Sequence, residues 1–439
     1  MSESARFDAQ TTAALKKVTT RLIPFLFVLY VFNYLDRINI GFAALQMNKE
    51  LGLTATVFGL SSTIFYLGYV ACEVPSNLLL ARFGARKWIA RILVSWGLAS
   101  AVTMFVNSAT TLHLARFLLG VLEAGFVPGV ILYLTYWFPT AVRARANSLM
   151  IMGQPLAMLI GAAMSGAIIQ HLDGLAGFSG WRWMFLIEGL PATILGIIAF
   201  FYLADRPRFA TWLKPEEALA LEREIATEEG SSAKLRFVDV LMDGRLLLLG
   251  AAYFGLCNTL NANATWTPTI LRDVMAAYSL TSVGLYAAIP PLFALIAMPL
   301  WAQSSDLRND RYWHVAIALL VTAIGWMSVM VSSDPMLRLA GLTLTTAGSL
   351  SAMVVFWAIP QTILSPQARP AGIGIISSIG LLGSALSPTV FGYLKDLTHS
   401  FTAGLIYVAV LLLISIAIIL SLRPRSRKQN ARVLLQSTK

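Results

Sequence analysis

The chain has 439 residues, of which 57% are hydrophobic and only 13% are charged, and its net charge is +11. Soluble domains carry about 25% charged residues, so this composition excludes an ordinary soluble protein and indicates an integral membrane protein. The positive charge does not indicate nucleic-acid binding, because the basic residues collect in short segments between long apolar runs.

Apolar runs of about 20 residues, the length of a helix that crosses a bilayer, recur along the chain. They are residues 22–45, 57–80, 88–107, 111–136, 146–170, 183–203, 245–270, 282–302, 313–332, 336–360, 371–394 and 401–422. We therefore predict an all-α membrane protein with twelve transmembrane helices in two six-helix halves.

The hydrophilic stretches divide the chain into four parts. We predict an N-terminal half over 1–203, a linker with a short amphipathic helix over 204–244, a C-terminal half over 245–422 and a tail over 423–439. Of the 33 basic residues, 26 lie in the tails, the linker and alternate loops, and only 5 lie in the remaining loops. By the positive-inside rule, this split predicts a multi-pass membrane protein with both termini in the cytoplasm.

Two apolar runs contain charged residues. Asp36 and Arg37 interrupt 22–45, and Arg116 and Glu123 interrupt 111–136. A charge at the centre of a membrane helix costs roughly 3 kcal/mol or more, so such residues are functional candidates. We predict that Arg37 and Arg116 bind a carboxylate at similar depth, with Glu123 about 10 Å deeper. Asp36 and Glu123 are predicted to carry the coupling proton; the alternative is that these groups form structural ion pairs only.

Four polar or aromatic residues in the second half are further candidates for substrate binding. Asn258 and Asn261 share one face of 245–270, and Trp357 and Gln361 share one face of 336–360. An intramembrane Asn can instead bond a neighbouring helix, and a Trp can simply pack. For each of these residues, both interpretations remain open.

Several motifs are missing from the sequence. It contains no GxxxxGK[ST] phosphate loop, no HExxH and no Cys/His cluster, so we expect neither ATP hydrolysis at a P-loop nor a metal site. We predict that the protein is not an enzyme and uses no cofactor other than the proton. Glu188 is expected to play a structural role, paired with Arg182.

The chain resembles the major facilitator superfamily, and within it the anion:cation symporter branch. The matching stretches, in family order, are NYLDRINIGFAAL, EVPSNLLLARFGARKW, RFLLGVLEAGFVPGVILYLTYWFP, RARANSLMIMGQP, GWRWMFLIEGLPA, DRPRFATWLKPEE, SDLRNDRYWH and GIISSIGLLGSALSP. The nearest likeness is to permeases of the 4-hydroxyphenylacetate, phthalate and tartrate types.

The resemblance implies a place in the cell inner (plasma) membrane and roles for individual residues. In this branch the residues matching Asp36 and Glu123 are proposed proton carriers, and those matching Arg37 and Arg116 bind or gate the anion. Three more matches imply substrate contact: Tyr34 and Tyr69 as cavity tyrosines, and Gln154 as a glutamine that contacts the substrate. The 371–394 run departs from the branch, because SSIGL stands at 377–381 where members often have Asn-Ser-Ile-Gly-Asn.

The leading interpretation is a proton-coupled symporter that imports a small organic anion, an aromatic or hydroxylated carboxylic acid, by alternating access. A tartrate or sugar-acid symporter is the alternative, followed by an organic-anion exchanger or exporter of the same fold. A membrane sensor and an intramembrane hydrolase fit the sequence less well. The expected partners are the carboxylate, protons and the lipid bilayer, without nucleic acid, and the protein is expected to be a monomer.

Overall fold

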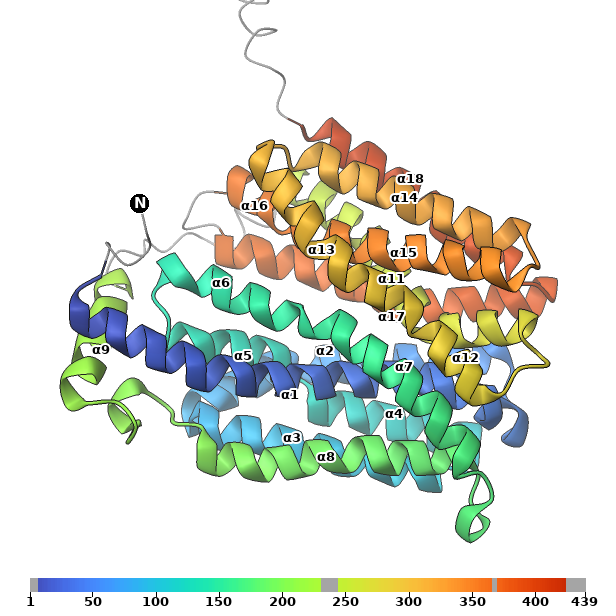
Figure 1. The fold of residues 1–439 in the computed structure, drawn as a ribbon, viewed down its shortest axis with the longest axis horizontal. Helices are drawn as coiled ribbons and strands as arrows, with labels where there is room; N and C mark the ends of the chain where they lie inside the picture. Colours follow the sequence, from blue (N-terminus) through green and yellow to red (C-terminus); the bar gives the residue numbers. More distant parts are fainter. Residues whose placement is uncertain (1–6, 230–243, 365–368, 424–439) are drawn as a thin grey trace, which may run out of the picture.

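The computed structural model describes residues 7–229, 244–364 and 369–423. The parts of the predicted linker and tail at 230–243 and 424–439 lie outside these residues. Within the described ranges, the secondary structure consists of helices and turns (Figure 1). The predicted all-α fold is therefore confirmed.

The N-terminal half contains the helices from α1 to α8. They are α1 (Ala9–Glu50), α2 (Ala55–Phe83), α3 (Ala85–Val102), α4 (Ala109–Glu123), α5 (Phe126–Thr135), α6 (Thr140–Ile151), α7 (Gly153–His171) and α8 (Gly180–Tyr202). The short helix α9 (Pro215–Glu229) follows, and it confirms the helix predicted in the linker. The pairs α4/α5 and α6/α7 each form one membrane-length segment with a break inside it.

The C-terminal half repeats this plan. It contains α11 (Gly244–Val274), α12 (Leu280–Ala287), α13 (Ile289–Leu307), α14 (Tyr312–Val331), α15 (Pro335–Phe356), α16 (Ala358–Ile363), α17 (Arg369–Thr398) and α18 (Thr402–Ser421). In the described residues, 11 helical segments are long and apolar enough to cross a membrane. The predicted span 245–270 is not one of them. It corresponds to α11, a 31-residue helix that packs along α17 and contains Asn258, Asn261 and Asn263.

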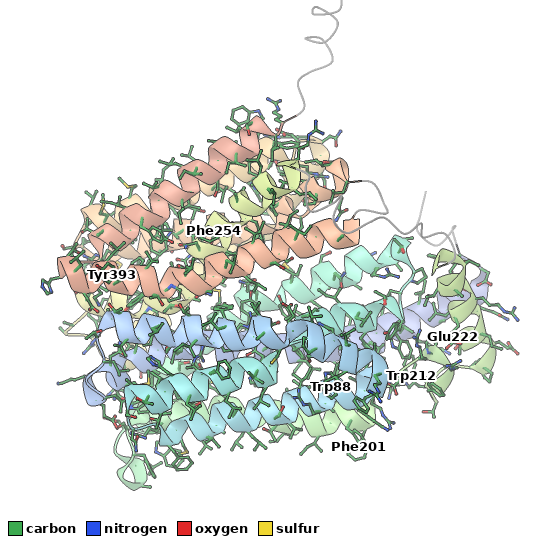
Figure 2. The ribbon with its side chains drawn as sticks, turned by 180° about the vertical axis from the view of Figure 1, so that it is seen from behind. Trp88, Phe201, Trp212, Glu222, Phe254 and Tyr393 are labelled. Atoms are coloured by element: carbon green, nitrogen blue, oxygen red, sulfur yellow. The ribbon has the colours of Figure 1, made fainter. Side chains whose placement is uncertain are left out.

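The helix bundle has two ends, which we call the α9 end and the end opposite α9. At the α9 end, Trp212 and Glu222 mark the linker; Tyr393, on α17, lies toward the opposite end (Figure 2). The predicted polar N-terminal tail is helical from Ala9, because α9 packs against this part of α1. Lys17 on α1 donates to both carboxylate oxygens of Glu217 on α9, at 2.7 and 2.8 Å.

Toward the end opposite α9, the two halves touch backbone to backbone. Four glycines allow this approach, since a Cβ at any of them would collide with the other half: Gly41 with Ala264, Gly59 with Pro388, Gly166 with Gly284, and Gly392 with Ala55. Toward the α9 end the ribbons of the halves diverge (Figure 1), and Gly374, near the start of α17, has no neighbour within 4 Å of an added Cβ. Among the described residues, these backbone contacts close the halves against each other at the end opposite α9.

One side chain reinforces this closed end. Asp396, near the end of α17, accepts hydrogen bonds from the backbone N–H groups of Ala55 and Thr56 at 3.0 and 2.7 Å. It also accepts from the Thr56 hydroxyl at 2.6 Å. A carboxylate at the start of α2 is favoured further, because a helix N-terminus carries partial positive charge.

Candidate functional site

The centre of the N-terminal half contains a buried cation–carboxylate contact. Arg37 on α1 donates from Nε and Nη2 to Oε1 of Glu123 on α4, at 2.9 and 2.7 Å. Asn33, one turn before Arg37, donates to the same oxygen at 2.8 Å. Glu123 is fully buried, and its second oxygen, Oε2, has no hydrogen-bond partner in the part of the chain that the structure describes. The carboxyl therefore has a free position for a proton.

The chain breaks its helix directly after Glu123. That residue ends α4, and Gly125 takes a left-handed conformation with φ of 84° before α5 begins. A Cβ on Gly125 would collide with the side chain of Ser76 on α2. Glycine is required here for both reasons, and the break leaves Glu123 on a helix end at membrane depth. Irregular backbone at this depth is tolerated only when protein or a water-filled cavity covers it.

Aromatic rings surround the Arg37 guanidinium. Its central carbon lies 5.2 Å from the ring centre of Tyr69 and 5.8 Å from those of Tyr34 and Phe65. Such contacts hold a cation without neutralising its charge. The Arg37 side chain keeps 17% of its surface exposed, whereas Glu123 keeps none. The cation therefore keeps part of its surface free of protein contact, and two of the predicted tyrosines lie beside it.

Asp36 is buried on a different side of α1 from Arg37. Consecutive residues on a helix point about 100° apart, so Asp36 faces α3 while Arg37 faces α4. Its carboxylate accepts hydrogen bonds from the Ser100 hydroxyl, from Trp96 Nε1 at 3.1 Å and from Asn39 Nδ2 at 3.1 Å. Asp36 is buried among these three donors, and none of the hydrogen bonds of the described residues joins it to Glu123.

Arg116 is buried on α4, seven residues before Glu123. Only 3% of its surface is exposed, and its guanidinium lies over the Phe65 ring at 4.8 Å. Its Nε has no hydrogen-bond partner among the described residues. The predicted separation of about 10 Å between the depth of the two arginines and that of Glu123 is wrong for Arg37, because Arg37 contacts Glu123 directly. Arg116 contributes almost no surface to a ligand in this conformation.

The two predicted asparagines of α11 have different neighbours. Asn261 donates from Nδ2 to the Tyr66 hydroxyl of α2 at 2.5 Å, a contact between the halves. Asn258 is fully buried and donates to the Tyr407 hydroxyl of α18 at 2.7 Å, within its own half. Asn261 thus lies where the halves meet near the Arg37 site, whereas Asn258 is engaged in helix packing.

The remaining candidates are spread over both halves. Trp357 is half-buried, and its ring lies 4.9 Å from Tyr253 and 5.6 Å from Phe356. Gln361 is exposed on α16. Gln154, at the start of α7, is buried, and its Oε1 has no hydrogen-bond partner among the described residues. Trp357 therefore belongs to an aromatic cluster of the C-terminal half, and a direct substrate contact for these residues stays a prediction.

Several site residues were not predicted. Asn33 and Tyr66 were detectable, since each precedes a predicted residue by one turn on the same helix face: Arg37 and Tyr69 respectively. Ser100 and Trp96 carry no such signal, because their role depends on how α3 packs against α1. Tyr253 is likewise visible only from the packing of α11 against α15.

The fold and the site together define a polytopic helical membrane transporter: two helical halves, closed at one end, with charged groups buried in the membrane-spanning part. The family model described as Major Facilitator Superfamily matches residues 26–361 and again 261–437. The chain belongs to the major facilitator superfamily.

Similar proteins agree with this assignment. The chain is 43% identical to a "Putative tartrate transporter" of Agrobacterium vitis, over 94% of this chain and 92% of that protein. It is 38% identical to the "Putative metabolite transport protein NicT" of Pseudomonas putida, over 94% and 95% of the two chains. The solved xylose transporter XylE from E. coli shares the fold, with a TM-score of 0.74 at 15% identity, covering 94% of this chain and 99% of XylE.

Proposed function

We propose that this protein is a proton-coupled symporter that imports a small organic anion by alternating access. The contact between Arg37 and Glu123 is the observation that carries this proposal. An arginine that is partly exposed offers a permanent cation to a carboxylate ligand, and its buried partner has one oxygen free for a proton. When the ligand takes Arg37 from Glu123, the buried carboxylate loses its counter-charge and favours its protonated form.

The direction of transport follows from orientation. The positive-inside rule supports a cytoplasmic position for the α9 end and both termini in an inner membrane. With that orientation, the contacts between Gly59 and Pro388 and between Asp396 and Thr56 close the periplasmic side. The proposed cycle then includes a state that is closed on the periplasmic side and releases the imported ligand and its proton toward the cytoplasm.

We favour a hydroxylated acid of the tartrate class as substrate. The relatives at 43% and 42% identity are both named putative tartrate transporters, and hydroxyl and amide groups surround the Arg37 site: Tyr34, Tyr66, Tyr69 and Asn261. These groups can bond the hydroxyls of such an acid. An aromatic acid is the second candidate, because Tyr253 and Trp357 form an aromatic surface that an aryl ring could join.

Uptake into proteoliposomes tests the proposal. The ligands are tartrate, hydroxybenzoic and phenylacetic acids, and sugar acids, with an inward proton gradient imposed. We expect one class to be taken up, and a protonophore to abolish the uptake. The variant Glu123→Gln should lose gradient-driven uptake and keep exchange of labelled for unlabelled ligand. Asp273→Asn, which removes a carboxylate bonded to Arg338 at the end opposite α9, is the matched control and should transport normally.

Two results would overturn the proposal in different ways. Gradient-driven uptake at the full rate in Glu123→Gln would remove Glu123 from the coupling mechanism. Saturable uptake that ignores the protonophore would identify a uniporter or exchanger instead.

A further inference from the structure

A small cavity lies where the two halves meet. Ile38 and Phe42 of α1 line it from the N-terminal half, and Asn263 of α11 lines it from the C-terminal half. Its volume is about 20 Å³, which is enough for one water molecule. The backbones of α1 and α11 approach closely at this depth, because a Cβ on Gly41 would lie 2.7 Å from the carbonyl oxygen of Ala264. This contact fixes the spacing of the two helices beside the cavity.

The Asn263 side chain is buried without a hydrogen-bond partner. Only 2% of its surface is exposed, and neither Oδ1 nor Nδ2 has a partner in the part of the chain that the structure describes. Buried polar groups are rarely left in this state. Thr267 and Thr346 add hydroxyl groups to the lining, and no charged residue is among the described residues that line the cavity. The cavity is therefore polar but carries no charge.

Two carbonyls at this cavity lack the donor that a helix would supply. Pro268 on α11 has no N–H, so the carbonyl of Ala264, four residues earlier, receives no helical hydrogen bond. Pro291 on α13 has the same effect on the carbonyl of Ala287, at the end of α12. All four residues line the cavity. The site thus combines an amide that donates with several oxygens that accept.

This mixture of donors and acceptors selects the occupant. A cation would leave the N–H groups of Asn263 unbonded, and an anion would leave Asn263 Oδ1 and the carbonyls unbonded. A water molecule both donates and accepts, and buried waters typically make about three hydrogen bonds to groups that are otherwise unpaired. We propose that the protein binds one water molecule here, between the halves, and that Asn263 holds it. The proposal does not depend on proton coupling or on the identity of the transported ligand.

The bound water keeps the closure of the end opposite α9 weak. Asn263 bonds to this water when the halves are closed and to solvent when they separate, so its side chain gains little from closure. An apolar side chain at this position would lose contact with water on closure, and that burial would stabilise the closed state. The hydrated contact therefore lets the halves separate more readily than a dry contact would.

X-ray footprinting tests the water site directly. Irradiation converts water into hydroxyl radicals that oxidise the side chains beside it, and mass spectrometry locates the products. Phe42 lines the cavity with only 3% of its surface exposed, whereas Phe58 on α2 is fully buried and does not line it. We expect oxidation of Phe42 well above that of Phe58 in wild type. Asn263→Leu should reduce it to the Phe58 level, because the larger apolar side chain takes the place of the water.

Cysteine modification tests the effect on closure. Ser62 is buried on α2, on the helix face that contacts the other half through Gly59 and Tyr66. As the only cysteine of the chain, Ser62→Cys should react with a maleimide when the halves separate at this end. Adding Asn263→Leu should slow the reaction about tenfold or more. Asn263→Ser keeps a hydroxyl that can hold water and should change the rate by less than about threefold.

Three results would overturn the proposal. Oxidation of Phe42 at the Phe58 level in wild type, or equal oxidation of Phe42 in wild type and Asn263→Leu, would remove the water site. Oxidation of Phe42 that disappears when tartrate is added would assign the site to a hydroxyl of the ligand instead of water. A maleimide reaction that Asn263→Leu does not slow would show that the site has no effect on closure.

Discussion

The contact between Asp396 and the start of α2 should set how often the end opposite α9 opens. Asp396 accepts three hydrogen bonds from Ala55 and Thr56 across the boundary between the halves. Asp396→Asn keeps one accepting oxygen but loses the charge and the second acceptor. Hydrogen bonds to a charged group contribute about 1.5–3 kcal/mol and neutral ones about 0.5–1.5 kcal/mol. Because Asp396 is only half-buried, we expect a net loss of about 2 kcal/mol, which lowers the closed-to-open population ratio about thirtyfold.

Distance measurements by double electron–electron resonance can test this shift. Spin labels on Asn107→Cys and Ser333→Cys, both exposed at this end of opposite halves, would report the separation in a background free of Cys72 and Cys257. The longer-distance population should grow in Asp396→Asn. Asp273→Asn makes the same charge change at the same end but breaks a bond within one half, and it should leave the distances unchanged. Identical distributions in wild type and Asp396→Asn, or equal shifts in both variants, would refute the reasoning.

Two further predictions concern the packing of single elements. The Lys17 ammonium holds the pKa of Glu217 below its ordinary value, so docking of α9 on α1 is strongest above about pH 4.5 and weakens as the pH falls through the lowered pKa. Hydrogen exchange of the α9 amides should show this pH dependence. Glu217→Gln should abolish the dependence and weaken the docking of α9 by about 0.5–1 kcal/mol. Gly125→Ala should destabilise the protein by roughly 2 kcal/mol or more, because it combines a left-handed conformation with a collision against Ser76. The control Gly52→Ala has φ of 62° but open space around it, so its melting temperature should fall less; equal losses would show that the collision has no effect.

Much of the fold could be predicted because the bilayer imposes a fixed helix length on an apolar sequence. This prediction fails where the length of a helix is set by packing and not by an apolar sequence. Residues 9–21 are too polar to be read as part of a membrane helix, yet α1 begins at Ala9 because α9 packs against it. The break after Glu123 was not predicted, because apolar residues resume directly after Glu123 and the break depends on the contact between Gly125 and Ser76.

The sequence allowed the charged residues of the site to be predicted, but not most of the contacts that they make. Arg37 and Glu123 could be identified because a charge in a membrane helix needs a partner, and the structure brings these two together. The network around Asp36 could not be predicted, because Ser100 and Trp96 are ordinary residues of α3 until the register of α1 against α3 is known. The predicted pair of Glu188 with Arg182 is wrong for the same reason: Glu188 accepts from the Ser165 hydroxyl of α7 at 2.6 Å, and Arg182 bonds to Glu50 at 2.8 Å.

The arrangement on α1 suggests how two carboxyls can respond to one ligand. Asp36 and Arg37 are consecutive, so one backbone segment holds both Asp36 against α3 and Arg37 against Glu123. A ligand carboxylate that draws Arg37 away from Glu123 must shift this segment or the Arg37 side chain. A shift of the segment would also strain the bonds from Ser100 and Trp96 to Asp36, and the proton affinity of both carboxyls would then change in one movement. A movement of the Arg37 side chain alone would leave Asp36 unaffected. The infrared band of the Asp36 carboxyl, recorded before and after ligand addition, distinguishes the two cases. A band that changes shows that the segment moves, and a band that stays constant assigns the coupling to Glu123 alone.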